Sequence, residues 1–402
     1  MPIAPAPPLE RGAVETWVRH HLARVIDGPV LGSDRFVGGQ QAADRALASF
    51  DVAGYADRRN EVLPLDARGA SGLSPWIRHG LLSLPHVWRA VGSGPGRDVR
   101  KFRDELLWQE YARHRYARLG RSTWSNPIAV DPDERDAGWG DGMACLDFVQ
   151  EELERTGWLV NQTRMWAASH WAVRHGLPWE QGENEMYRHL LDGSRAANGL
   201  GWQWTAGVAT GKPYGFSRMQ VERRAPELCG RCPLRDACPI SDWPDPANPT
   251  RIASRAMTAD PAPEATGGPV SVDAAGTPDA VWLTAESMGD GDPALAAHPD
   301  LPAVFVFDLP LLGRLKLAAK RLVFLAESIA DLAERRPVEV RVGDPVAELA
   351  GRRLAATFTP VPGWKRRSQE VDIVALHPWP WLVPPHGGSV ASFSAWRRKT
   401  GL

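Results

Sequence analysis

Hydrophobic residues recur at helical spacing through the first part of the sequence, from Ala42 to about Ile240. Apolar positions three and four residues apart are typical of amphipathic helices, and short Gly and Pro interruptions separate the runs. Two of the clearest helical runs are residues 101–120 and 145–176. The pattern predicts an all-helical domain over residues 1–241.

A stretch rich in Pro, Ala, Gly and small polar residues follows over residues 242–278. Because it buries too little apolar surface to offset the entropy lost on ordering, it predicts a linker. Residues 279–402 then alternate short buried-strand runs with helical runs, which predicts a small parallel α/β domain of the Rossmann-like kind. The expected strands are residues 280–284, 303–308 and 338–342, and the expected helices are an amphipathic one at 313–336 and another at 344–352.

Length and composition narrow the class of protein. A chain of 402 residues suggests two or three domains, and 43% hydrophobic with 24% charged residues excludes disordered, collagenous and coiled-coil proteins. No run of 18 uncharged apolar residues predicts a transmembrane helix, and residues 1–12 lack a signal-peptide core, so we expect a cytoplasmic protein. Because the net charge is −1, a nucleic-acid partner would need a local basic patch.

The chain has four cysteines, and three of them form a C-x2-C-x5-C triplet at Cys229, Cys232 and Cys238. In a cytosolic chain such spacing favours metal binding over disulfides. Four thiolates can complete a tetrahedral zinc site or hold a [4Fe–4S] cluster, and Cys145 is the remaining cysteine. A remote ligand before a compact triplet favours the cluster, with zinc and plain thiols as the alternatives.

Two long strings, residues 152–171 and 178–204, resemble the flavin-binding domain of the cryptochrome/photolyase family. The strings begin ELERTGWLVNQTR and PWEQGENEMYRHL, and the resemblance extends over roughly residues 41–215. The sheet-rich end resembles the family's α/β antenna domain. That domain usually comes first, so the resemblance implies a permuted order. The further matching segments, in the family's order, are residues 42–60, 69–83 and 102–114.

The resemblance implies FAD in a helical bowl. The flavin phosphates would lie at a turn that reads Ala70–Ser74 here, where hydroxyls and backbone amides at a helix start can hold an anion. Gln109 and Ser194 stand where the family has an Arg and an Asp, which removes one charge of each sign. The full set implied for FAD is Tyr55, Ser71, Leu73, Ser74, Phe102, Gln109, Asn161, Arg164, Asp192, Ser194 and Asn198.

The resemblance also implies a pocket for a flipped-out pyrimidine dimer and a tryptophan relay that carries electrons to the flavin. Within the pocket, two pairs of residues lie three and four apart on helices and so share a face. The residues implied for the dimer are Glu105, Trp108, Asn161, Met165 and Trp204, and those for the relay are Trp202, Trp179 and Trp124. The family's pocket Arg is Gln162 here.

Two functions are therefore expected. The first is a light-driven DNA lyase that uses FAD to split cyclobutane pyrimidine dimers, with dimer-containing DNA as the partner of a monomeric protein. The alternative is a cryptochrome-like blue-light photoreceptor without repair activity. The retained pocket residues favour repair, whereas Gln109, Gln162 and the near-neutral charge favour sensing. The sequence leaves the antenna chromophore unidentified.

Overall fold

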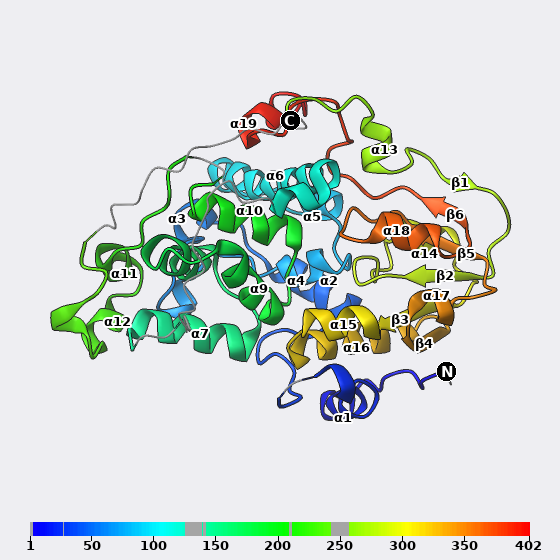
Figure 1. Cartoon of the computed structure of the whole chain (residues 1–402), viewed down its shortest axis with the longest axis horizontal. Helices are drawn as coiled ribbons and strands as arrows, with labels where there is room; N and C mark the ends of the chain where they lie inside the picture. Colours follow the sequence, from blue (N-terminus) through cyan, green and yellow to red (C-terminus); the bar gives the residue numbers. More distant parts are fainter. Residues whose placement is uncertain (1–2, 27, 125–138, 140–141, 209–210, 243–256) are drawn as a thin grey trace.

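The structure is a computed structural model that describes residues 3–26, 28–124, 139, 142–208, 211–242 and 257–402. A helical part lies beside a part built on a sheet (Figure 1). The helices before the sheet are α1 (Arg11–His21), η1 (Ala23–Val25), α2 (Gln40–Ser49), α3 (Tyr55–Arg58), η2 (Leu65–Ala67), α4 (Ser74–Arg78), α5 (Leu84–Ala90), α6 (Gly96–Leu119), η3 (Gly120–Trp124), α7 (Ala144–Thr156), α8 (Asn161–Ser169), η4 (His170–Arg174), α9 (Trp179–His189), α10 (Arg195–Thr205), α11 (Arg218–Arg224), α12 (Pro226–Arg231) and η5 (Arg235–Ala237).

The second part contains the sheet and its covering helices. Its elements are α13 (Pro263–Gly267), β1 (Asp273–Ala274), β2 (Ala280–Leu283), α14 (Pro293–Ala297), β3 (Ala303–Asp308), α15 (Leu309–Leu315), α16 (Ala319–Ala333), β4 (Val338–Gly343), α17 (Pro345–Glu348), β5 (Leu354–Thr357), α18 (Trp364–Gln369), β6 (Ile373–His377) and α19 (Phe393–Arg397).

The sheet has six strands in the order β1-β6-β5-β2-β3-β4, and every pair except β1 with β6 is parallel. The chain runs outward from the central β2 through β3 to β4, then crosses to β5 and β6 on the other side. All positions of β2 and β5 are buried, as expected for strands covered on both faces. The predicted parallel sheet flanked by helices is confirmed.

The single amphipathic helix predicted over residues 313–336 is wrong in two respects. The segment forms two helices, because Lys316 adopts a left-handed conformation with φ 47° that ends α15. The second helix, α16, is buried along almost its whole length rather than on one face. It contacts β4 of the sheet and also α1 and α2, so it has no solvent side.

Three polar side chains of α16 hold the start of α2. Glu327 accepts a hydrogen bond from the Gly38 amide (2.7 Å), and Ser328 accepts one from Gly39 (3.0 Å). Asp331 accepts the amide of Gln40 (2.8 Å), the first residue of α2. Because the first amides of a helix lack partners within it, α16 supplies the cap that α2 needs. The buried polar stripe of α16 is thereby satisfied.

The ends of the predicted domains lie against the sheet. Ala4 forms an isolated antiparallel bridge with Val340 of β4, and α1 contacts α16. Residues 257–278 of the predicted linker include α13 and the edge strand β1, while residues 243–256 lie outside the described residues. The limits 1–241, 242–278 and 279–402 therefore stay predictions.

Gly38→Ala should destabilise the fold, because a Cβ at this position would overlap the Phe324 carbonyl oxygen and the Ser328 side chain. Overpacking of this kind costs about 1–3 kcal/mol. The measurement is the free energy of unfolding in denaturant. Gly313→Ala is the matched control, because it lies in a helix with open space around it and should be neutral or slightly stabilising. Equal stability of the two variants would contradict the α2–α16 contact.

Candidate functional site

A cavity of about 290 Å³ lies in the helical part, with walls from α6, α8 and α10. We call it the helical cavity. It collects side chains from segments far apart in the sequence, including most of the set implied for FAD. The members of that set that line it are Tyr55, Ser71, Ser74, Phe102, Gln109, Asn161, Arg164, Asp192 and Asn198.

Two members of the implied FAD set lie elsewhere. Leu73 is fully buried in the core just before α4 and does not line the cavity. Ser194 caps α10, where its hydroxyl accepts a hydrogen bond from the Ala197 amide (3.4 Å). Ser194 and Asp192 are therefore close in sequence, but only Asp192 lines the helical cavity.

Arg164 and Asp192 form an ion pair of 2.7 Å at the wall of the helical cavity. The pair uses only Oδ2 of Asp192. The other oxygen of Asp192 and Nδ2 of Asn198 are buried without a hydrogen-bond partner in the described part of the chain. Because unpaired buried polar atoms are costly, these two atoms indicate a polar ligand. The donors and acceptors present therefore fit the flavin that the resemblance implies.

The turn that carries Asp192 is held from outside the cavity. Arg78 of α4 donates to the Gly193 carbonyl (2.6 Å), and Arg321 of α16 donates to the carbonyls of Tyr187 (2.6 Å) and Gly193 (3.3 Å). A ring nitrogen of His79 lies 3.1 Å from the Leu191 carbonyl. Burial, with the charge of Arg78 next, lowers the pKa of His79 to about 3.

Glu105, Asn161 and Met165, which were implied for the dimer, line the same helical cavity. Sequence reasoning missed the two cations that meet Glu105. Lys101, one helical turn earlier, lies 2.7 Å from its Oε1 atom, and Arg59, just after α3, lies 3.3 Å from it. The i,i+4 spacing of Lys101 and Glu105 was the available signal.

Tyr55 forms part of the same wall as Glu105. Its pKa is raised, mainly by burial and then by the charge of Glu105. The phenol therefore stays protonated at neutral pH and can donate a hydrogen bond into the cavity.

The two aromatic walls implied for the dimer do not line the helical cavity. Trp108 stacks on Phe393 of α19, with ring centroids 4.0 Å apart and 11° between the planes. Trp204 is 37% exposed and lies 5.8 Å from the Tyr214 ring. Gln162, which replaces the family's Arg, donates to the Tyr214 hydroxyl (2.8 Å). Phe393 carried no sequence signal beyond a resemblance to the antenna domain.

The three relay tryptophans occupy neighbouring helices. Trp202 of α10 lines the helical cavity, and it lies against Gly182 of α9, where a Cβ would overlap its ring. Trp179 is one turn away on α9, and its ring stacks on Trp124 with centroids 5.4 Å apart. Trp179 is buried and Trp124 is half-buried. This is the order, from cavity towards surface, that the resemblance implies.

Cys145 of α7 and the triplet Cys229, Cys232 and Cys238 line one small cavity, although 84 residues separate Cys145 from Cys229. All four are free thiols. Burial, followed by the other cysteines, raises the pKa of Cys145 to about 12. Within the described residues, no three His, Cys, Asp or Glu side chains are grouped so that they could hold a single metal ion. The cluster and zinc interpretations stay predictions.

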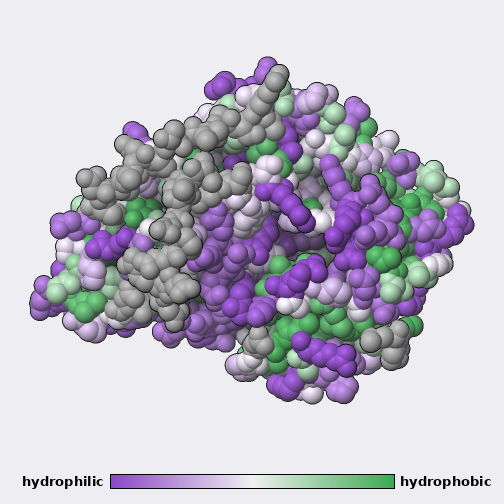
Figure 2. Space-filling view, in the orientation of Figure 1, coloured by the Kyte–Doolittle hydropathy of each residue, from purple (hydrophilic) through white to green (hydrophobic). Residues whose placement is uncertain are grey.

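A second cavity, of about 340 Å³, lies where the helical part meets the sheet, and we call it the junction cavity. The ends of β2 and β3 and the segment after β5 form one wall, which is the switch point where open α/β sheets bind ligands. Figure 2 shows a hollow in the middle of this face, surrounded by hydrophilic residues. Trp282 and Trp364 stack in its wall with centroids 5.4 Å apart.

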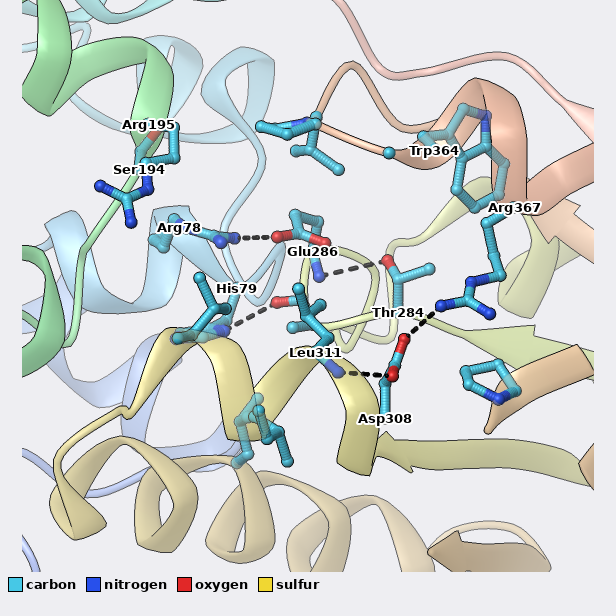
Figure 3. A pocket seen from close by; sticks show the side chains of 18 of the residues that line it. Arg78, His79, Ser194, Arg195, Thr284, Glu286, Asp308, Leu311, Trp364 and Arg367 are labelled. Carbon is cyan, nitrogen blue, oxygen red and sulfur yellow. Dashed lines mark hydrogen bonds and ion pairs between the residues drawn. The ribbon is translucent and has the colours of Figure 1, made fainter. Parts of the chain in front are cut away.

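Charged side chains span the junction cavity (Figure 3). Arg78 of the helical part pairs with Glu286 (2.5 Å), and Asp308 accepts a hydrogen bond from Arg367 (2.6 Å). Arg195 reaches the cavity from the start of α10. Arginine outnumbers acidic side chains in the wall, so the cavity is suited to an anionic, planar ligand.

Residues 102–223 match the FAD binding domain of DNA photolyase. The chain is 36% identical over 213 residues to the deoxyribodipyrimidine photo-lyase of Thermus thermophilus, which covers 47% of this chain and 48% of that protein. It is 28% identical over 248 residues to cryptochrome DASH of Idiomarina loihiensis, with 53% and 54% covered. A solved class III photolyase of Agrobacterium tumefaciens is 26% identical, has a TM-score of 0.43, and covers 47% of this chain and 43% of its own.

The helical part thus carries an FAD-binding domain of the photolyase type. Over this part, the chain is similar to members of the cryptochrome/photolyase family. It spans about half the length of the curated relatives it matches. None of the helices in the described residues has the length and apolar character needed to cross a membrane.

Asp192→Ala should sharply lower the flavin content of the purified chain, because it removes the partner of Arg164 and a charged acceptor at the cavity wall. Asp192→Asn should retain more flavin than Asp192→Ala, since it keeps the shape and one acceptor. The measurement is flavin released per chain after denaturation, with circular dichroism to check folding. A folded Asp192→Ala variant with undiminished flavin would contradict this assignment of the cavity.

Proposed function

We propose that this chain is a light-driven DNA lyase that splits cyclobutane pyrimidine dimers. The observation that carries the proposal is that Glu105, Asn161 and Met165 share one cavity with eight further residues implied for FAD. Contact between a cofactor and a lesion needs such a shared space. The similarity to photolyases gives the proposal its reaction class.

The reaction needs no general acid and base. One electron enters the dimer, the two bonds between the bases break, and the electron returns, so there is no net oxidation. When bound in its reduced form and excited by light, FAD supplies that electron. Glu105 in its protonated form would donate a hydrogen bond to the lesion and so stabilise the added negative charge, and Met165 would provide a polarisable floor. Trp202, Trp179 and Trp124 would restore the reduced state of the cofactor from the surface.

The alternative function is a blue-light photoreceptor. The position of Trp108 favours it, because this ring, on which a flipped base was expected to stack, does not line the helical cavity. Gln162 favours it as well, since its side chain is hydrogen-bonded to Tyr214 and does not line the helical cavity. Both functions would use the same cavity and relay, so only repair separates them.

Glu105→Ala should lower the yield of dimer splitting several-fold while leaving flavin content unchanged. The reason is that the side chain faces the lesion space and is not among the residues implied for FAD. Lys101 and Arg59 would remain without their carboxylate, so DNA binding should be retained or increase. The measurement is the loss of dimers from DNA under blue or near-ultraviolet light, with the cofactor chemically reduced. Glu105→Gln should retain part of the yield.

The matched control is Asp57→Ala, which removes an exposed carboxylate that pairs with Arg97 and does not line the helical cavity. It should repair like the wild type. If the wild type is fully reduced, binds dimer-containing DNA and leaves the dimers intact at every light dose, repair is wrong and the photoreceptor function takes its place.

The four cysteines are proposed to hold a [4Fe–4S] cluster. Two arguments support this: all four line one cavity, and a purely thiolate donor set suits iron–sulfur chemistry. Zinc held by four thiolates is the alternative. The cluster would tie α7 to α12.

Cys232→Ser should remove iron and acid-labile sulfide from the anaerobically purified chain and lower its melting temperature, because metal-binding energy in a closed site is folding energy. Cys145→Ser should do the same if the remote cysteine is a ligand. Arg235→Ala, which lines the same cavity without a thiol, is the control and should keep its iron. If the wild type contains zinc and no iron, the proposal of a [4Fe–4S] cluster is wrong.

The junction cavity is our proposed site for the antenna chromophore, whose identity stays open. Its support is the position at the switch point of the sheet, the stacked Trp282–Trp364 pair and the excess of arginine in its wall. Light energy absorbed there would have to reach the helical cavity across the turn that carries Asp192.

A further inference from the structure

The segment Leu382–Lys399, which we call the α19 segment, lies across one face of α6 (Figure 1). Glu110 accepts hydrogen bonds from the amides of Leu382 (2.6 Å) and Val383 (3.0 Å). Arg118 donates to the carbonyls of Gly388 (2.6 Å) and His386 (2.9 Å). Side chains of α6 therefore hold the backbone of the first part of this segment, residues 382–388.

Helix α19 itself is fixed by a buried anchor. Trp396 is fully buried, with its ring 5.7 Å from Tyr111 and 5.2 Å from His114. Arg397 pairs with Asp104 of α6 at 2.7 Å. A segment held in this way is a constant part of the surface rather than a flap that opens.

The α19 segment lies next to the helical cavity. On α6, Glu105 faces the cavity, while Asp104 and Trp108 contact α19. The two sets are neighbouring stripes of one helix. Phe393 stacks flat on one face of Trp108, so it fixes the plane of that ring one helical turn along α6 from the cavity-lining Glu105. One face of the ring is thus supported.

The rim is also positively charged, although the whole chain is not. Arg59, Lys101 and Arg397 are linked to the two carboxylates Asp104 and Glu105. Arg398 and Lys399 follow on α19, are exposed, and form no ion pair with any residue in the described ranges. In this group of seven side chains on α3, α6 and α19 and next to them, five cations stand against two carboxylates.

We infer that the α19 segment is a wall of the DNA-binding surface, in which Arg398 and Lys399 contact phosphates and Phe393 positions Trp108 for stacking. The inference rests on the proposed function for the lesion, but its contacts to phosphate do not need repair. Cations beside an aromatic ring at the mouth of a cavity are the combination that single-stranded DNA recognises.

The test is binding in the dark of a labelled single-stranded oligonucleotide, with and without one pyrimidine dimer, at several salt concentrations. Arg398→Ala/Lys399→Ala should weaken binding of both oligonucleotides and reduce the slope of log affinity against log salt by about 1.4, because each phosphate contact on a single strand contributes about 0.7. The control Arg19→Ala/Arg24→Ala removes two exposed cations near α1, on the opposite side of the molecule in Figure 1, and should bind like the wild type.

Phe393→Ala tests the positioning role separately. It should leave the affinity for undamaged DNA unchanged and lower the preference for dimer-containing DNA several-fold, with circular dichroism to check that the variant is folded. Phe393→Tyr keeps the ring and should restore the preference. Tighter binding of dimer-containing DNA by Phe393→Ala would overturn the inference, because Phe393 would then obstruct the site.

The failures of the two proposals are distinguishable. If Arg398→Ala/Lys399→Ala leaves the binding and the salt slope unchanged, the proposed role of the α19 segment in DNA binding is wrong, even if the wild type repairs dimers. If this variant binds more weakly and has a smaller salt slope, the result supports the role of the α19 segment in DNA binding, even if illumination leaves the dimers intact and the repair function is wrong. A wild type that binds neither oligonucleotide at low salt overturns the inference.

Discussion

The wall of the helical cavity depends on one constraint: the turn formed by residues 190–193 is held by buried side chains from both parts of the chain. Arg78 and Arg321 donate to its last carbonyl, and Arg321 reaches it from α16 of the sheet part. Buried carbonyls need such partners, and charged donors give the stronger hydrogen bonds. Side chains of the helical part and of the sheet part therefore hold the turn together, and with it Asp192, which pairs with Arg164 at the helical cavity.

Two cavities follow from this docking. The helical cavity lies on one side of the turn, and the junction cavity lies on the other, with Arg78 and Arg321 in its wall. Helix α6 has a similar double use, because Glu105 faces the helical cavity while Glu110 and Arg118 hold the α19 segment. Because the sheet part follows the helical part in this chain, the α19 segment places side chains beside α6. Phe393 at the ring of Trp108 is the clearest case.

The sequence predicted what local patterns encode. Buried runs located β2, β3 and β4, and a long ordered resemblance located most of the helical cavity. Prediction from the sequence failed where tertiary contacts decide the local structure. Lys316 in a left-handed conformation split a continuous apolar run, and α16 is buried all round because α1 and α2 cover it. The α19 segment has no periodicity, since its backbone hydrogen-bonds to α6 side chains. The sequence grouped Cys145 with the triplet only because it is the remaining cysteine. The packing of α7 on α12 is what brings the four cysteines to one cavity.

The measurement that tests the central claim most directly is an experimental structure of the whole chain with FAD bound. The account predicts flavin in the helical cavity, with its phosphates at the turn of Ser71 and Ser74 and its ring between Arg164, Asn198 and Trp202. The unpaired atoms of Asp192 and Asn198 should then have ligand partners. Flavin bound only in the junction cavity, with the helical cavity empty at saturating FAD, would contradict it.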